Sequence, residues 1–289
     1  MKIKDLFRDK TVFSFEVFPP KKTSSIDVIY NTLDELSDLK PDFISVTFSA
    51  GGSGNGGYAC DIASKIKEMG IIPVLHLPCI NYTHEEIDAT LDEVKRRGIE
   101  NILALRGDIN PDIPPKREFL HASDLITYLK TKGDFDISGA CYPECHPDSD
   151  TIDEDIDNLK IKVEAGADHL ISQLFFDNES FYSFVEKVRA KGIDVPIEAG
   201  IMPVVNKNMI ERMVTTCGAS LPQKFVKIMQ RYEHNPEALR DAGIAYAINQ
   251  IVDLAASGVD GIHLYTMNNA YVARKISEAV SGILKHDKA

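Results

Sequence analysis

The sequence is poor in basic residues, has few cysteines and contains no long apolar run. Its 32 Lys and Arg against 44 Asp and Glu give a net charge of −12. A nucleic-acid-binding surface needs a basic face, so this charge argues against that function class. No run of about 18 apolar residues occurs, and we therefore expect no membrane span. The opening residues Met1–Asp5 lack the apolar stretch of a signal peptide, which predicts a cytoplasmic protein.

The five cysteines do not form the dense pattern of a disulfide-stabilised protein. Cys141 and Cys145, followed at once by His146, raise the question of a metal site. A zinc site needs a second pair of ligands at suitable spacing, and none follows in the sequence. We therefore predict no metal, and expect the thiols to be buried or to line a cleft.

Short β-branched and aromatic runs alternate with longer segments of helical period, which is typical of βα units around a parallel sheet. The predicted strands are Thr11–Phe18, Asp42–Phe48, Ile72–Leu77, Asn101–Leu105, Asp136–Tyr142, His169–Phe176, Pro196–Ile201 and Gly261–Tyr265. Amphipathic helices are predicted between them, among others over Ile26–Leu39, His84–Arg97, Asp153–Ala165 and Ser180–Ala190.

Eight strands in 289 residues predict a (β/α)8 TIM barrel, and we interpret residues 1–289 as a single catalytic domain. No strand is followed by the G-x-G-x-x-G turn of a dinucleotide-binding open sheet. The interval from Ile201 to Gly261 is unusually long. Extra helices are predicted there over Asn206–Thr215, Pro222–Arg231 and Pro236–Ala256, on the face where such barrels carry their active sites.

Polar residues stand at the C-terminal ends of almost all the predicted strands. Each has a structural alternative: His76 could be a hydrogen-bonded core residue, Gln173 could fill the barrel, and Asp108 could cap a turn. Together they indicate a cleft for a polar ligand at this end. The set is Glu16, Thr47, His76, Arg106, Asp108, Tyr142, Glu144, His146, Gln173 and Tyr265.

Seven motifs carry a resemblance to a known family: FSFEVFPP, SVTF, HLPC, ALRGD, YPECHP, NLKIKVEAGAD and SQLFFD, in this order from Phe13 onwards. The chain resembles the flavin-dependent methylenetetrahydrofolate reductases of the bacterial, single-domain type, as far as Asn269. The resemblance implies a (β/α)8 barrel that holds FAD and reduces 5,10-methylenetetrahydrofolate to 5-methyltetrahydrofolate in one-carbon metabolism. NADH or NADPH would be the reductant.

The resemblance implies that Glu16 and Asp108 are catalytic. Glu16 matches the general acid, which protonates N10 so that the folate ring opens before hydride arrives. A carboxyl group can do this at neutral pH only if it keeps its proton, which burial between Phe15 and Val17 favours. An ordinary salt-bridged glutamate would fit the strand equally well. Asp108 matches a residue that lies beside both flavin and folate.

Further positions match family residues that bind the cofactor or the substrate. Asp155, Asn158 and Lys162 are spaced so that one helix face presents all three. Gln173 matches a residue that contacts both folate and nicotinamide, and Tyr265 and Asn269 also fall at the folate site. The expected cofactor-binding residues are Thr47, Phe48, Ala50, His76, Arg106, Gly107, Asp108, Ala122, Tyr142, His146, Asp155, Asn158 and Lys162.

The chain also departs from the family pattern. Asn269 replaces an arginine linked to the folate's glutamate tail, and Ile161 replaces a cofactor-binding cation. Lys207 stands where a phenylalanine stacks on the nicotinamide, which predicts weak use of NADH. The glycine-rich stretch 51–57 has no P-loop lysine and is interpreted as a lid or linker.

Several alternatives stay open. Electrons could come from ferredoxin or from a partner subunit, and the barrel could form a homo-oligomer. A metal- or Schiff-base-dependent aldolase on the same barrel is a second alternative; it would need a lysine within a strand, and the predicted strands contain none. A non-catalytic barrel subunit would not need Glu16 and Asp108. A yellow purified protein that bleaches on reduction would favour the reductase.

Overall fold

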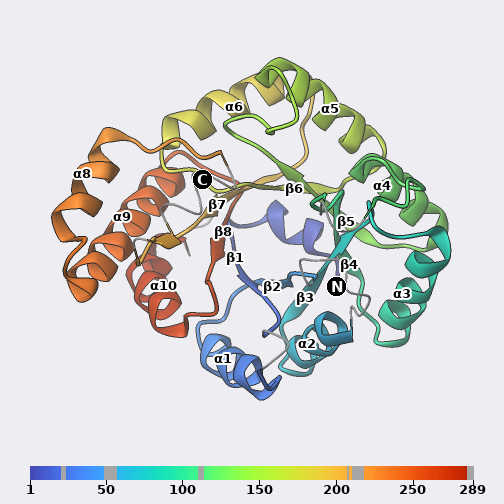
Figure 1. Ribbon diagram of the computed structural model, residues 1–289, viewed down its shortest axis with the longest axis horizontal. Helices are drawn as coiled ribbons and strands as arrows, with labels where there is room; N and C mark the ends of the chain where they lie inside the picture. The colour runs from blue at the N-terminus through green and yellow to red at the C-terminus, as the bar shows by residue number, and fades with distance from the viewer. Residues whose placement is uncertain (21–23, 49–56, 110–113, 207, 210–217, 285–289) are drawn as a thin grey trace.

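Eight parallel strands close into a barrel in sequence order, β1 to β8, as the sequence predicts (Figure 1). The computed structural model describes residues 1–20, 24–48, 57–109, 114–206, 208–209 and 218–284. The strands are β1 (Val12–Val17), β2 (Phe43–Val46), β3 (Ile72–Pro78), β4 (Asn101–Leu105), β5 (Asp136–Cys141), β6 (His169–Ser172), β7 (Ile197–Ile201) and β8 (Gly261–Tyr265).

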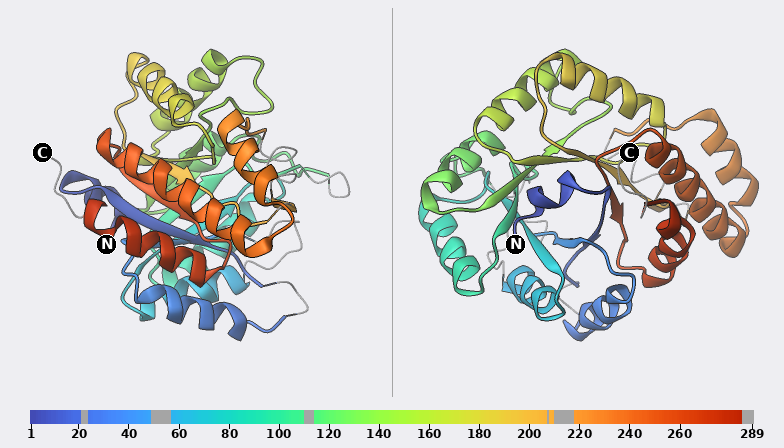
Figure 2. Two further views of the ribbon diagram at one scale, coloured as in Figure 1. Left: turned by 90° about the vertical axis from the view of Figure 1, so that its left-hand side faces the viewer. Right: turned by 180° about the vertical axis from the view of Figure 1, so that it is seen from behind.

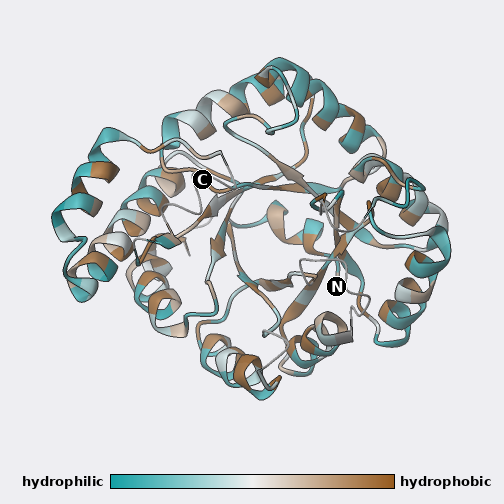
Figure 3. Cartoon of the chain, viewed as in Figure 1, coloured by the Kyte–Doolittle hydropathy of each residue, from teal (hydrophilic) through white to brown (hydrophobic). Residues whose placement is uncertain are grey.

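Helices surround the barrel and cover the outer face of the strands (Figures 1 and 2). Their apolar residues pack with those of the strands in the main hydrophobic core. Figure 3 shows hydrophobic, brown stretches on both the helices and the strands. The helices are α1 (Asp27–Ser37), α2 (Gly57–Glu68), α3 (His84–Arg96), α4 (Ala122–Lys132), α5 (Ile152–Glu164), α6 (Asn178–Ala190), α8 (Gln223–Tyr232), α9 (Pro236–Ala256) and α10 (Ala270–Leu284).

The predicted insertion between the last two strands is confirmed for α8 and α9. Helix α9 starts where the sequence predicts, because the side chain of Asn235 accepts a hydrogen bond from the backbone of Ala238 and Pro236 occupies the first turn. Helix α8 lies outside α9 at the edge of the barrel (Figure 1). Most of the remaining predicted helix, 206–215, lies outside the described residues.

One strand is shorter than its hydrophobic run predicts. The run continues to Phe176, but β6 ends at Ser172. Leu174 and Phe176 are buried after the strand ends, where the ring of Phe176 stacks on that of Phe225 with centroids 4.5 Å apart. Hydrophobicity here reports burial against α8 rather than strand pairing, so the C-terminal half of the predicted strand was wrong.

Gln173 is the first residue after β6 and stays attached to the barrel. Its backbone N–H donates to the carbonyl oxygen of Cys141, the last residue of β5, at 2.7 Å. This bond holds Gln173 at the C-terminal rim, although it lies beyond the end of the strand.

A short 3-10 helix, η1 (Ile3–Arg8), closes the N-terminal end of the barrel and was not predicted. It is the short blue helix at the centre of Figure 1. Ile3 and Phe7 are buried in a cluster with Val12 and Phe43, which fill the same end of the barrel. The backbone of η1 is also anchored, since Ile3 N–H donates to Asn101 Oδ1 at 3.1 Å.

Candidate active site

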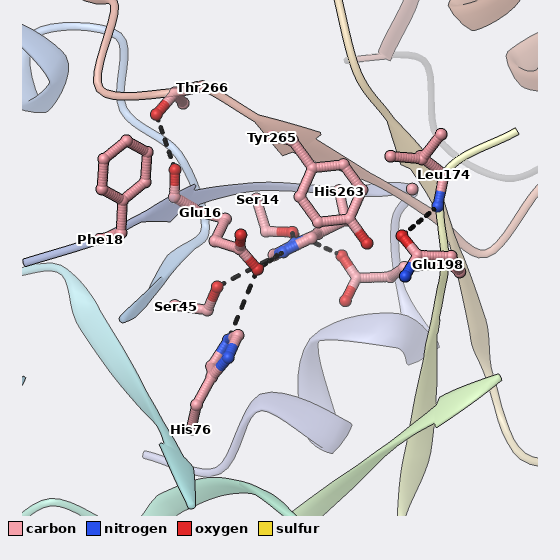
Figure 4. A network of polar contacts seen from close by, with 12 residues as sticks. Ser14, Glu16, Phe18, Ser45, His76, Leu174, Glu198, His263, Tyr265 and Thr266 are labelled. Carbon is pink, nitrogen blue, oxygen red and sulfur yellow. Dashed lines mark hydrogen bonds and ion pairs between the residues drawn. The ribbon is translucent and has the colours of Figure 1, made fainter. Parts of the chain in front are cut away.

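Glu16 points into the barrel from the C-terminal end of β1. It lies level with Tyr265 of β8 and Ser45 of β2 in the strand register. Its carboxylate Oε2 lies 3.6 Å from His76 Nε2 and 3.8 Å from His263 Nε2, and its side chain is 19% exposed. These side chains converge in Figure 4. Among the described residues, the basic groups that face Glu16 are therefore two imidazoles and no lysine or arginine.

His76 lies directly beneath Glu16 and is almost fully buried. Its Nε2 has no hydrogen-bond partner among the described groups. Burial lowers the pKa of His76 to about 4, and the nearby Glu16 only partly opposes that effect. His76 is consequently neutral at neutral pH and brings no positive charge to Glu16.

Tyr265 and Gln173 border the same end of the barrel. The Tyr265 hydroxyl donates to the carbonyl oxygen of Ser172 at 2.7 Å, which fixes the ring across β6 and β8. Gln173 Oε1 accepts from the backbone N–H of Leu174 at 2.9 Å. A Cβ on Gly200 would lie 2.8 Å from the Tyr265 ring, so the glycine makes room for that ring.

The loop after β4 carries Arg106, Gly107 and Asp108. Gly107 has φ +87°, and a Cβ there would lie 2.9 Å from Pro78 Cβ, so only glycine fits without strain. The guanidinium of Arg106 forms an ion pair with Asp148 at 2.5 Å. Asp108 is exposed, as a residue that meets a ligand at the rim can be.

Tyr142, His146 and Asp155 form a second group, next to β5. The rings of Tyr142 and His146 are 4.5 Å apart and nearly perpendicular. Asp155 Oδ2 accepts from the backbone N–H of His146 at 3.0 Å. Burial raises the pKa of Tyr142 to about 12 and also raises the pKa of Asp155, so this corner is weakly hydrated.

Helix α5 carries Asp155, Asn158 and Lys162. Asn158 is exposed, whereas Asp155 and Lys162 are half-buried. Lys162 Nζ donates to the carbonyl oxygen of Ala140 at 2.5 Å, and burial lowers its pKa. Gly139 allows this approach, because a Cβ there would lie 2.8 Å from Lys162 Cδ.

The remaining predicted residues are spread along the same rim. Thr47 and Phe48 follow β2, and the Phe48 ring meets that of Tyr82 edge-on at 6.0 Å. Ala122 is the first residue of α4. Asn269 Oδ1 accepts from the backbone N–H of Val272 at 3.1 Å and so caps α10. Ala50 and Lys207 lie outside the described residues.

A buried group that the sequence did not reveal lies below Glu16. Ser14, Ser45, His169, Glu198 and His263 are all fully buried inside the barrel. Barrel interiors are usually filled with branched apolar side chains, so this polar layer is unusual. One signal was available: Ser14 and Glu16 are two residues apart in β1 and therefore share a face.

The residues at the rim suit an anionic dinucleotide better than a metal. Arg106 and Lys162 are cations of the kind that pair with a pyrophosphate, and the half-buried ring of Tyr142 offers a flat apolar surface. In the part of the chain that the structure describes, no cluster of His, Cys, Asp and Glu is placed to hold a metal ion. No described helix is long and apolar enough to cross a membrane.

Comparison with known proteins identifies the family. The profile described as methylenetetrahydrofolate reductase matches residues 2–281. The 5,10-methylenetetrahydrofolate reductase of Escherichia coli K12 is 37% identical over 264 residues, which cover 91% of this chain and 88% of that protein. Methylenetetrahydrofolate reductase 1 of Schizosaccharomyces pombe is 35% identical over 98% of this chain and 48% of its own length. The chain is thus an oxidoreductase by class, and it belongs to the methylenetetrahydrofolate reductase family.

A solved structure supports the fold. An uncharacterised Clostridium thermocellum protein, described as binding two copies of 5-methyl-5,6,7,8-tetrahydrofolic acid, matches with a TM-score of 0.68 at 16% identity. The match covers 97% of both chains. At this identity the likeness concerns the barrel alone.

Proposed function

We propose that the protein reduces 5,10-methylenetetrahydrofolate to 5-methyltetrahydrofolate with FAD as cofactor and NADH or NADPH as the source of electrons. Membership of the family supports the folate substrate. The observation that carries the chemistry is the place of Glu16, at the active-site end of the barrel with no lysine or arginine partner among the described residues.

Glu16 acts as the proton donor in this proposal. A proton placed on N10 of the folate turns that nitrogen into a leaving group and leaves an electrophilic iminium at N5. FAD, when bound, supplies the hydride that completes the reduction. Because His76 is neutral, it forms no ion pair that would have to break before Glu16 could carry the proton.

The other rim residues bind and orient in this proposal. Arg106 and Lys162 hold the pyrophosphate, and Asp108 stands beside the flavin and the folate. Gln173, Tyr265 and Asn269 meet the folate. The remaining cofactor-binding set is Thr47, Phe48, His76, Gly107, Ala122, Tyr142, His146, Asp155 and Asn158, with Ala50 beyond the described residues.

The test is the pair of half-reactions in Glu16→Gln. We expect this variant to keep its flavin and to accept electrons from NADH, and to lose folate reduction by about 10²-fold or more, the usual contribution of a general acid. Glu278→Gln, on the exposed face of α10, is the control and should match the wild type in both steps. Full folate reduction by Glu16→Gln would contradict the role.

The electron donor needs its own experiment. Anaerobic reduction of the bound flavin by NADH, NADPH and reduced ferredoxin, each in turn, ranks the candidates. If Lys207 weakens nicotinamide binding, Lys207→Phe should reduce the concentration of NADH needed for half-maximal flavin reduction. Saturation of the wild type at low NADH, with no gain in the variant, would contradict this.

A further inference from the structure

A row of buried polar groups, His263, Ser14 and Glu198, runs from Glu16 into the barrel and is called the file below. His263 Nε2 lies 3.8 Å from Glu16 and 3.4 Å from the hydroxyl of Ser45, and His263 Nδ1 lies 2.7 Å from Ser14 Oγ. Ser14 Oγ in turn lies 2.7 Å from Glu198 Oε1. Ser14, His263 and Glu198 are 0% exposed, so solvent reaches none of them. Figure 4 shows Glu198 and Glu16 on opposite sides of His263.

Glu198 carries a proton at neutral pH. Burial, helped by the negative charges of Asp42 and Asp260, raises the pKa of Glu198 to about 8, and the hydrogen bond with Ser14 only partly opposes them. Asp42 is paired with Lys10 and Asp260 with Arg189.

From β6, His169 faces Glu198, with Nε2 3.8 Å from Oε2. Burial lowers the pKa of His169 to about 3, so it brings no positive charge. On its other side His169 Nδ1 lies 3.8 Å from Asp136 Oδ1, and burial raises the pKa of that carboxyl to about 6. No lysine or arginine among the described residues therefore pairs with Glu198.

The file admits two hydrogen-bond arrangements, because the Ser14 hydroxyl has one proton to donate and an imidazole with a single ring proton can carry it on either nitrogen. With the proton on Glu198, the carboxyl donates to Ser14, Ser14 donates to His263 Nδ1, and Nε2–H faces Glu16 and Ser45. With the proton on Glu16, Glu16 donates to Nε2, Nδ1–H donates to Ser14, and Ser14 donates to an ionised Glu198.

We propose that Glu198 is a proton store for Glu16, coupled to it through Ser14 and His263; this rests on the proposed role of Glu16 as proton donor. One proton leaves Glu198 for Ser14 Oγ, the Ser14 proton moves to His263 Nδ1, and the Nε2 proton moves to Glu16. Each group ends with its original number of protons except the two carboxyls, which exchange one. The step requires the 3.8 Å gap at Glu16 to close to hydrogen-bond distance, about 3 Å.

Infrared spectroscopy tests the store without any assay of catalysis. We expect the wild type at neutral pH to show the C=O stretch of a protonated carboxyl that is lost in Glu198→Gln. Glu16→Gln should shift the titration midpoint of that band by about one pH unit, as coupled groups do. If Glu198→Gln retains the band, or Glu16→Gln leaves the midpoint unchanged, the proposal is wrong.

The pH profile of folate reduction is the second readout. Glu198 holds its proton below about pH 8, so the wild-type rate of folate reduction should fall as pH rises through about 8. Glu198→Gln should be slower by about tenfold and should lack this fall, given a general-acid contribution of that order or more. Ser14→Ala should retain the infrared band of the protonated carboxyl, but its rate of folate reduction should not fall as pH rises through about 8. A wild-type profile in both variants would overturn the proposal.

Ser138→Ala is the matched control for Ser14→Ala. Ser138 is equally buried in the barrel, but its hydroxyl has no hydrogen-bond partner among the described residues and is not part of the file. It should leave band and profile unchanged. A wild type that cannot reduce the folate would refute the proposed function, whereas the infrared coupling would still decide the link between Glu16 and Glu198.

Discussion

The hydroxyl of Thr266 donates a hydrogen bond of 2.6 Å to the carbonyl oxygen of Glu16, so the residue after β8 holds the end of β1. Thr266→Val keeps the shape but removes the donor, and the carbonyl loses this partner. We expect the free energy of unfolding to fall by about 1–3 kcal/mol, measured by urea denaturation. Thr266→Ser retains the hydroxyl and should lose less; equal stability of the two variants would contradict the assignment.

Two helical glycines should respond oppositely to alanine. A Cβ on Gly243 in α9 would lie 1.8 Å from the carbonyl oxygen of Val204, which is backbone and cannot move aside cheaply. Gly243→Ala should therefore cost about 1–3 kcal/mol of stability or more. Gly282 in α10 has open space around it, and Gly282→Ala should add about 0.5–1 kcal/mol. Denaturation midpoints of both variants test the pair.

Glu198 should make the folded protein less stable as pH rises. Its pKa is raised from 4.5 to about 8, so between these values the unfolded chain has lost the proton that the folded chain keeps. The free energy of unfolding therefore falls across this window. Glu198→Gln should flatten the dependence of Tm on pH there. An unchanged slope would show that Glu198 is not protonated in the folded state.

His169 should act in the opposite direction. Its pKa is lowered from 6.5 to about 3, so below pH 6.5 the unfolded chain binds a proton that the folded chain does not. Stability is lost as pH falls through this range. His169→Gln should reduce the acid-induced loss of Tm below pH 6.5. A loss of Tm as large as that of the wild type would contradict the prediction.

The pair between Arg106 and Asp148 should compete with cofactor binding. Asp148 is exposed, so the pair contributes little to stability. A phosphate approaching Arg106 has to displace this carboxylate. Asp148→Asn should therefore bind FAD several-fold more tightly, measured by quenching of flavin fluorescence. Asp153→Asn, in the first turn of α5, is the control, and weaker binding in Asp148→Asn would contradict the competition.

The barrel and the rim residues could be predicted from the sequence because both depend on local pattern. Parallel strands bring their C-terminal ends together, so Glu16, Arg106 and Tyr142 had to share one end of the fold. The motif order then supplied the family. The roles of the individual residues stay predictions, since they derive from the resemblance.

The buried file could not be predicted, because it depends on strand register. Ser14 lies opposite His263 in the pairing of β1 with β8, whereas Glu198 reaches the same serine from β7. Periodicity assigns a face to each residue but does not set the height of one strand against another. Helix η1 was missed for a similar reason, since its few apolar residues form no periodic pattern of their own and become buried only by packing against the end of the barrel.

The closure of the barrel by η1 has a consequence for the order of folding. Ile3 and Lys4 make hydrogen bonds with Asn101 and Asp136, and Lys4 also bonds with Asp168. These partners lie between 98 and 164 residues further along the chain and are therefore synthesised much later. Helix η1 cannot complete these contacts until the segment leading into β6 has been synthesised. Contacts so distant in sequence also form slowly. The first helix of the chain is therefore among the last elements to dock on the barrel.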